Sequence, residues 1–514
     1  PSPAIDIFAR DFERSRQEFE AGAGAIAASL SVVLFYLCAR LKVSQGVSII
    51  ATFIFAFATS TWTISSQGVW QHTTASLVLL AAMLCLLKAN RKSGSQYHLL
   101  LGLAGFFCGL LPGCRPTSLL FVMAMGVYAL YTHGLKSRFF MLGLLSIFLS
   151  IAWNTHFFGW SYALSGGYSI YERTYYKFTL EQFKIGFFGV LLSPSKGWLW
   201  GCPVMLFAIP GVYQVWRQRG KQDENLFLLL GLACGGLFLN YCFYVAWHGA
   251  SADGPSRFMT DTLPIMLLFI AYFLEGFRRW SIGQRQAAEI DSPSDEAKAQ
   301  SPLKRVGAGL VLVSLITLTS WSMFVQAVGA FGNHTHWILI PTKSATERVW
   351  KFEDNSILRT WNSVKYKIAS PIQNGKQYRD GFQGTLQSLS IADRPLKNDR
   401  IVMRSGRLVI LTADLLNTGS SEWYGYETGM DKDIAMLSVY FYDQKNQQVP
   451  RQQRKSTLYI SGNVAPGEIG QAIGDVKFPT ESGNYKAVFQ IERRRRSISQ
   501  QTIDNAYTVD VEVK

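Results

Sequence analysis

Charged and aromatic side chains lie in several short polar joints between the apolar runs of this sequence, where charge is costly. The clearest group is SADGPSRFMTDTLP, residues 251–264, which leads directly into the apolar run IMLLFIAYFLEGF. It holds Arg257 between two carboxylates, Asp253 and Asp261, in a loop that contains Gly and Pro. A guanidinium can bind phosphate in a bidentate way. The sequence therefore predicts an anion-binding site at this joint.

Other joints supply residues of the same kinds. If a helical bundle brings them together, they form a cavity with several cations, a few carboxylates and many aromatic rings. Cations suit the phosphate of a lipid head group, and aromatic faces suit sugar rings. We expect phosphate to be bound by Arg257, Lys196, Arg115 and His72, in a pocket formed by Trp70, Trp247, Glu172, Arg173 and Asp253.

Each of these residues also has a purely structural interpretation. Trp70 and Trp247 are typical of the aromatic belt at a membrane interface. His72 could form hydrogen bonds at a helix end, and Arg115 could snorkel outward. The two carboxylates near Arg257 could do no more than pair with it and keep it oriented.

The elements that must position these residues are apolar runs between about residues 22 and 330. A membrane helix needs about 20 mainly apolar residues to cross the hydrocarbon core. About ten runs approach this length, near residues 22–39, 45–61, 73–88, 98–112, 117–131, 139–153, 201–216, 226–245, 259–275 and 305–330. Their number predicts a polytopic α-helical membrane protein. A long outer loop is expected over 154–200.

The formal net charge is +15, and its distribution predicts an orientation. Basic residues gather in alternate joints: Arg40 and Lys42; Lys88, Arg91 and Lys92; Lys136 and Arg138; Arg217, Arg219 and Lys221; and Arg278, Arg279, Arg285, Lys304 and Arg305. Lys and Arg near helix ends are retained in the cytoplasm. We expect these joints to be cytoplasmic, and residues 1–21 and 331 onward to lie outside. Topology explains the charge, so nucleic acid is not expected as a partner.

The chain outside the apolar region predicts three further segments. Residues 1–21 have the pattern of a helix lying in the outer interface, and 331–380 connect the bundle to the tail. From about 381 to 514 the period changes to two, in RLVILTADLLN, IAMLSVYFYD, GQAIGDVKF, NYKAVFQI and AYTVDVEV. Turn signals between these runs favour an extracytoplasmic all-β sandwich. The seven cysteines lack metal-ligand spacing, so no metal site or other cofactor is predicted, and a requirement for a divalent cation is left open.

Five motifs in order carry a resemblance to a known superfamily. QGVWQHTTASLVLLAAMLCLL, LPGCRPTSLLF, FFGWSYALSGGY, LLSPSKGWLWGCPV and WHGASADGPSRFMTDTLP look like the bacterial multispanning glycosyltransferases of the GT-C superfamily. Within it they resemble the branch related to protein O-mannosyltransferases and lipid A aminoarabinose transferases. The resemblance covers roughly residues 20–330, and the tail resembles the β-sandwich appended to some of these enzymes.

The resemblance implies a GT-C-like bundle in the bacterial cytoplasmic membrane. It implies an inverting transfer, outside the membrane, from a polyprenyl-phosphate sugar to a hydroxyl of a glycan, lipid or protein. A general-base Asp in the first outer loop would accept the hydroxyl proton. Most of that loop is expected to precede Pro1, so the base is expected outside this sequence; Asp6 and Asp11 lie on what remains of the loop and are the candidates here.

Other function classes stay open from the sequence. A transporter or flippase of lipid-linked glycans would also need a cationic cavity, but it would show charges deep within spans or broken helices in two similar halves. A glycan polymerase or ligase would require a diphosphate donor. A surface anchor that displays the β domain is disfavoured, because display needs one span.

Overall fold

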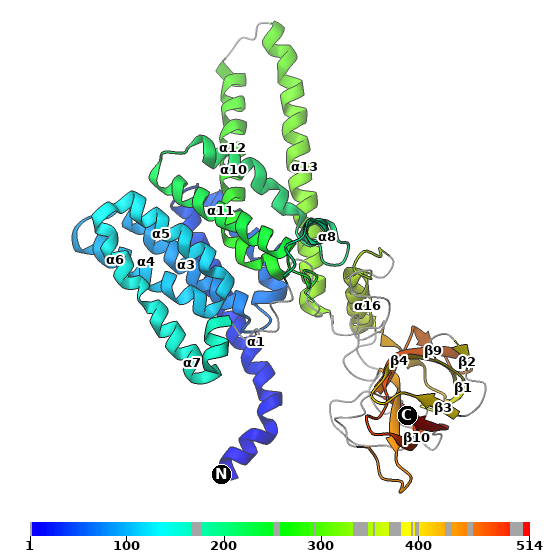
Figure 1. Cartoon of the computed structure of the whole chain (residues 1–514). Helices are drawn as coiled ribbons and strands as arrows, with labels where there is room; N and C mark the ends of the chain where they lie inside the picture. The colour runs from blue at the N-terminus through cyan, green and yellow to red at the C-terminus, as the bar shows by residue number, and fades with distance from the viewer. Residues whose placement is uncertain are drawn as a thin grey trace. The chain divides into compact units, whose positions relative to one another are not determined.

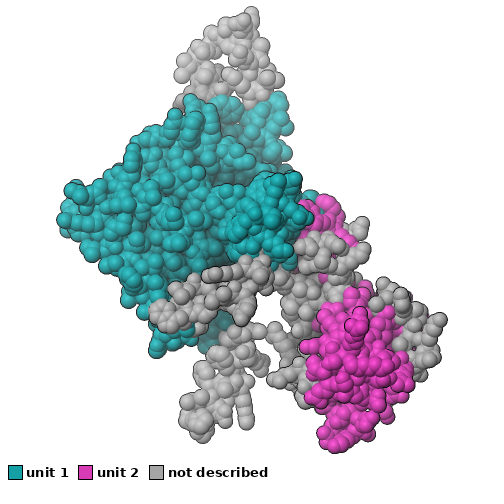
Figure 2. All heavy atoms as spheres, in the orientation of Figure 1, with its two compact units in different colours: residues 1–249, 253–330 teal, residues 250–252, 331–514 magenta. Residues whose placement is uncertain are grey.

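The computed structural model describes residues 3–165, 176–249, 257–290, 295–332, 348–352, 355–369, 382–391, 394–395, 400–426, 434–449, 456–493 and 507–514. The chain divides into two compact units, residues 1–249 with 253–330 and residues 250–252 with 331–514 (Figure 2). Each unit is described by itself.

The first unit is a bundle of helices (Figure 1). They are α1 (Pro3–Arg40), α2 (Gln45–Phe57), α3 (Gln71–Ala89), α4 (Gly94–Cys114), α5 (Leu119–His133), α6 (Arg138–Leu144), α7 (Ser146–Ser165), α8 (Leu180–Leu192), α9 (Trp198–Gly201), α10 (Ala208–Arg217), α11 (Gln222–Cys242), α12 (Leu263–Ile290) and α13 (Asp295–Phe331). Seven helical segments among the described residues are long and apolar enough to cross a membrane. The prediction of a polytopic helical bundle is confirmed to that extent.

The helices differ from the predicted runs in three places. Residues 3–40 form one continuous helix, where the sequence predicted a separate helix over 1–21. The first part of the predicted loop 154–200 is helical, because α7 continues to Ser165 through a kink at Gly159, whose φ is 83°. The run near 201–216 is broken into α9, a 3-10 turn and α10.

Glycines let neighbouring helices approach closely. A β-carbon on Gly105 of α4 would lie 1.9 Å from the carbonyl oxygen of Phe140 in α6. The same distance separates a β-carbon on Gly211 of α10 from the carbonyl oxygen of Phe269 in α12. In Figure 1, α4 lies between α3 and α6. Contact of this kind is the usual way in which membrane helices pack, since small residues at the interface give close van der Waals contact.

Polar contacts gather at the two ends of the bundle. At one end, which we name the basic end, the joints after α1, α3 and α10 meet around Asp223, the second residue of α11. At the opposite end, the start of α3, the end of α4 and the 3-10 helix η6 (Arg257–Thr262) meet around Asp261. Alternate joints therefore share an end, as the distribution of basic residues predicted.

The second unit holds α16 (Ser356–Ala369) and a β domain. Its strands are β1 (Gly384–Ile391), β2 (Arg394–Pro395), β3 (Arg400–Met403), β4 (Leu408–Asn417), β5 (Trp423–Tyr424), β6 (Ala435–Tyr442), β7 (Ser456–Ile460), β8 (Asn463–Val464), β9 (Ile469–Lys477), β10 (Gly483–Arg493) and β11 (Tyr507–Val513). The five runs of period two are all strands, so the prediction of a β-sheet domain in the tail is confirmed for the described residues.

The predicted sandwich is built as one curled sheet. Nine strands follow the order β2-β1-β4-β9-β7-β6-β10-β11-β3, and β5 pairs with β8 apart from them. Gly384 of β1 lies against Trp423 and against Ile491 of β10, although β1 and β10 are far apart in this order. Strands from both ends of the sheet contribute to a single buried core, so the sheet curls around that core.

Candidate functional site

A buried group of three ionisable side chains lies at the opposite end of the bundle. His72, Arg115 and Asp261 are 3%, 5% and 2% exposed. Nδ1 of His72 lies 2.8 Å from Oδ1 of Asp261, and Nη1 of Arg115 lies 2.7 Å from Oδ2 of the same carboxylate. The charges of Arg115 and Asp261 balance each other, which a buried charge requires.

Arg115 also contacts the imidazole of His72 directly. Its Nη1 lies 2.9 Å from Nε2 and also contacts Nδ1, the nitrogen that faces Asp261. A carboxylate accepts hydrogen bonds, so Nδ1 of the imidazole donates to Asp261. The unit charges of Arg115 and Asp261 cancel within this group.

Aromatic rings connect this group to Arg257. Nη2 of Arg115 donates to the hydroxyl of Tyr241, near the end of α11. The Tyr241 ring stacks on Phe258 with a centroid distance of 4.7 Å. The preceding residue, Arg257, holds its guanidinium 4.7 Å from the centroid of the half-exposed Trp70 ring. A cation in this position is attracted by the face of the indole.

A second cation of the candidate set lies in the turn between α8 and α9. Lys196 is buried there, and its charge acts on His248. Burial, followed by this ammonium group, lowers the pKa of His248 from its ordinary value. Trp247 is buried against α8, where a β-carbon on Gly189 would lie 2.5 Å from the indole ring. Trp247 follows Tyr244 by one turn, and the Tyr244 ring contacts Phe258 at 5.7 Å.

The structure thus places six of the candidate residues at one end of the bundle: His72, Arg115, Arg257, Trp70, Lys196 and Trp247. Asp6 and Asp11 belong to α1, but their side chains lie outside the described residues. Glu172, Arg173 and Asp253 lie outside them as well. One expectation is wrong: Asp261 contacts His72 and Arg115 in place of Arg257, because those two residues meet its carboxylate in the buried interior.

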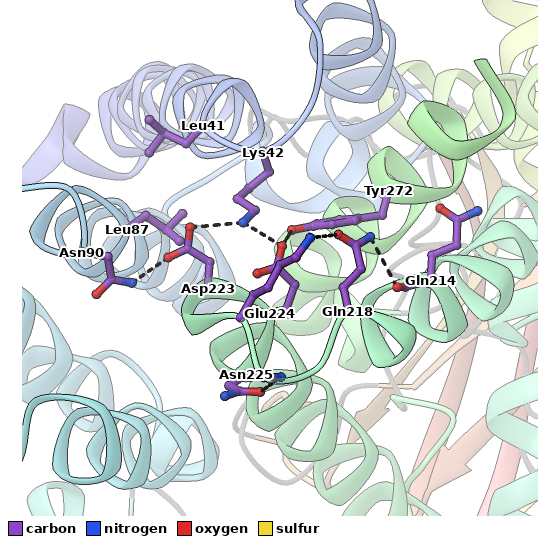
Figure 3. A network of polar contacts seen from close by, with 12 residues as sticks. Leu41, Lys42, Leu87, Asn90, Gln214, Gln218, Asp223, Glu224, Asn225 and Tyr272 are labelled. Atoms are coloured by element: carbon purple, nitrogen blue, oxygen red, sulfur yellow. Dashed lines mark hydrogen bonds and ion pairs between the residues drawn. The ribbon is translucent and has the colours of Figure 1, made fainter. Parts of the chain in front are cut away.

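A second polar network, at the basic end, was missed by the sequence analysis (Figure 3). Lys42 lies 3.1 Å from Asp223 and 2.8 Å from Glu224, and both acids are buried. Arg91 reaches Asp223 at 2.6 Å, and Tyr272 of α12 donates to Glu224 at 2.9 Å. The available signal was the pair of acidic residues in KQDENLF, within a joint that is otherwise basic. This network joins α1, α3, α11 and α12.

The two ends differ in what they offer chemically. At the basic end each buried carboxylate already contacts a cation or a hydroxyl, so the network has a structural role and holds neighbouring helices together. At the opposite end, Arg257 and Lys196 add two more cations to those of the buried group. Cations of this kind suit an anionic ligand.

Comparisons with known proteins leave the family open. No protein-family model matches the chain, and no curated protein matches it. The solved structures with some likeness include the CARDB domain of a Pyrococcus furiosus protein, in complex with di-metal ions, at TM-score 0.16 and 14% identity, covering 26% of this chain and 94% of that domain. A family 123 glycoside hydrolase from Clostridium perfringens has TM-score 0.17 and 12% identity, covering 26% of this chain and 27% of the hydrolase. The chain thus spans about a quarter of that hydrolase. At these TM-scores neither likeness bears on function.

Proposed function

We propose that this chain is a membrane glycosyltransferase that moves a sugar from a polyprenyl-phosphate donor to an acceptor hydroxyl. The observation that carries the proposal is the guanidinium of Arg257, which lies over the Trp70 ring at the same end of the bundle as Lys196 and the buried group of His72, Arg115 and Asp261. A guanidinium can bind phosphate in a bidentate way. The opposite end of the bundle would then face outside the bacterial cytoplasmic membrane.

The reaction needs cations where the phosphate departs. The acceptor oxygen attacks the anomeric carbon, the bond from that carbon to the phosphate oxygen breaks, and the electron pair leaves with the polyprenyl phosphate. Arg257 and Lys196 would stabilise the charge that develops on the leaving phosphate. The hydroxyl proton passes to a carboxylate base, a role for which Asp6 and Asp11 stay the sequence candidates. The resemblance of the motifs to GT-C glycosyltransferases supports this assignment.

The distribution of buried charge favours this proposal over a transporter. A transporter of lipid-linked glycans is expected to hold charged groups near the middle of its spans. Three of the four buried acids among the described residues lie at helix ends: Asp223 and Glu224 begin α11, and Asp261 precedes α12. The fourth, Glu275, lies within α12 but at the basic end, where it accepts from Ser44 at 2.6 Å.

The test measures polyprenyl phosphate, the product common to every sugar and acceptor. The full chain in lipid nanodiscs is supplied with a panel of polyprenyl-phosphate hexoses and pentoses and a detergent extract of bacterial envelopes as acceptor. Mass spectrometry follows the release of polyprenyl phosphate and the mass gain of the acceptor. We expect Arg257→Ala to lose about 100-fold in rate, the usual effect of removing one group that stabilises developing charge. Arg257→Lys keeps the charge but loses the planar fork, so its loss should be smaller.

The matched control is Arg219→Ala. Arg219 also stacks on an indole, with its guanidinium 4.2 Å from the ring of Trp216, but it lies at the basic end of the bundle. Its removal should leave the rate unchanged. Equal rates for Arg257→Ala and the wild type would refute the assignment of Arg257. Movement of the intact donor across a vesicle membrane, with no release of polyprenyl phosphate, would identify a transporter.

A further inference from the structure

The 3-10 helix η6 is tied to its surroundings by three separate contacts. Arg257 lies over Trp70 at the start of α3. Thr260 hydrogen bonds to Ser60 at 2.8 Å, and both hydroxyls are buried. Asp261 binds His72 and Arg115 at the same time. Of these ties, the one through Asp261 joins η6 to two helices, α3 and α4.

The chemistry of this position requires a carboxylate. Asp261 uses one oxygen for His72 and the other for Arg115, and both partners are donors. An amide of the same shape offers a single acceptor, and its NH2 group would face a donor. It would also leave the buried charge of Arg115 without a counter-charge, which is strongly unfavourable.

We propose that Asp261 is a positioning residue, which holds η6 on α3 and α4 and thereby fixes the guanidinium of Arg257 in the pose that binds an anionic head group. That the ligand is an anionic head group rests on the proposed function. That Asp261 fixes the position of Arg257 does not. Asp261 touches neither Arg257 nor the expected ligand. It acts on Arg257 through the backbone of η6, in which the two residues are four positions apart.

Hydrogen exchange tests the pose without a ligand. Asp261→Asn in the full chain should raise the exchange rates of the amides of residues 257–262 and of the residues around Trp70 and His72. Asp223→Asn is the matched control, because it also removes a buried carboxylate that pairs with arginine, but at the basic end. It should leave exchange at 257–262 unchanged. Wild-type exchange at 257–262 in Asp261→Asn overturns the proposal.

A double-mutant cycle tests the action through Arg257. The probe is decyl phosphate, compared with decanol, and binding to the detergent-solubilised full chain is measured by calorimetry. We expect Asp261→Asn to weaken decyl phosphate binding about tenfold, within the usual coupling of residues that act together. In an Arg257→Ala background the same change should have no further effect. Additive losses would show that Asp261 does not act through Arg257, and would overturn the proposal.

The two measurements separate this proposal from the proposed function. If the wild type binds decyl phosphate no better than decanol, the phosphate assignment fails, and the exchange result alone decides whether Asp261 positions η6. If Asp261→Asn does not fold, His72→Gln takes its place in both measurements, since it removes the contacts of the imidazole with Asp261 and Arg115 but keeps the ion pair between those two residues. Raised exchange at 257–262 in His72→Gln supports the proposal, and unchanged exchange overturns it.

Discussion

Nδ1 of His72 lies 2.8 Å from Oδ1 of Asp261, and the two residues are 189 positions apart in the sequence. The contact joins α3 to η6 at one end of the bundle. At the basic end, the contact between Lys42 and Asp223 joins residues that are 181 positions apart. Both pairs are buried or nearly so. In a membrane bundle, where lipid is as apolar as the helix surfaces, such polar contacts help to define which helices lie together.

The network at the basic end should contribute measurably to stability. Asp223→Asn removes the contacts of the carboxylate with Lys42 and Arg91; Arg91 loses its carboxylate partner, while Lys42 keeps Glu224. Breaking a buried pair from one side costs about 3–5 kcal/mol. Because the Arg91 side chain is 35% exposed, solvent screening reduces the loss, and we expect about 2 kcal/mol. Thermal unfolding in detergent measures it.

The control for this prediction is Glu181→Gln. Glu181, like Asp223, lies in the first turn of its helix, but it is exposed. Its neutralisation should change the free energy of unfolding by less than about 0.5 kcal/mol. An unfolding temperature of Asp223→Asn equal to that of the wild type would contradict a stabilising role for the network.

Two glycines in neighbouring helices should respond to alanine in opposite directions. In Gly105→Ala the new methyl would collide with the backbone of Phe140, so α4 and α6 must separate. We expect a loss of about 1–3 kcal/mol, the usual cost of overpacking. Gly126 of α5 has nothing within 4 Å of the corresponding position. Gly126→Ala should therefore gain about 0.5–1 kcal/mol from helix propensity.

Denaturation by sodium dodecyl sulfate, relative to the wild type, measures the loss of stability of Gly105→Ala and the gain of Gly126→Ala in one experiment. If Gly105→Ala is as stable as Gly126→Ala, the close approach of α4 and α6 is not part of the native packing.

The sequence predicted the helices, the strands and the grouping of joints, because hydropathy, period and the placement of Lys and Arg are local patterns. It identified Arg115 and His72 as polar residues at helix ends, but it did not pair them with Asp261, since pairing depends on tertiary contacts. It considered a direct pair between Asp261 and Arg257, four residues away, whereas the carboxylate binds side chains from α3 and α4.

The acids of the basic end were missed for a different reason. The rule for topology counts Lys and Arg and gives little weight to Asp and Glu. Asp223, which is close in sequence to Arg217, Arg219 and Lys221, was therefore not identified as a buried partner. Its burial follows from the packing of α11 against its neighbours, which hydropathy does not report.

The core of the β domain should depend on Trp423. This side chain is fully buried and lies against Gly384 of β1. Trp423→Ala should lose about 3–5 kcal/mol, the range for a large aromatic side chain removed from a core. Hydrogen exchange of the strands in the full chain measures the loss. Val402→Ala on β3, where the side chain is 49% exposed, is the control and should stay within about 0.5 kcal/mol. If the strand amides of Trp423→Ala are as well protected from hydrogen exchange as those of the control, Trp423 is not part of the core.

The pH dependence of stability should report the electrostatic effect of Lys196 on His248. The pKa of His248 is lowered in the folded protein, first by burial and then by the charge of Lys196, from an ordinary value of 6.5. As the pH falls below this value, the unfolded chain takes up a proton that the folded protein still excludes. Stability is therefore lost with falling pH, until the pH passes the lowered pKa of the folded state.

Unfolding temperatures between pH 8 and pH 5 test this for the wild type, His248→Gln and Lys196→Met. His248→Gln should remove part of the loss at low pH, while the other titrating groups cancel in the difference. Lys196→Met removes the nearby charge, so the pKa of His248 should rise toward its ordinary value and the loss should shrink without disappearing. Parallel curves for all three proteins would show that His248 and Lys196 do not interact in the folded state.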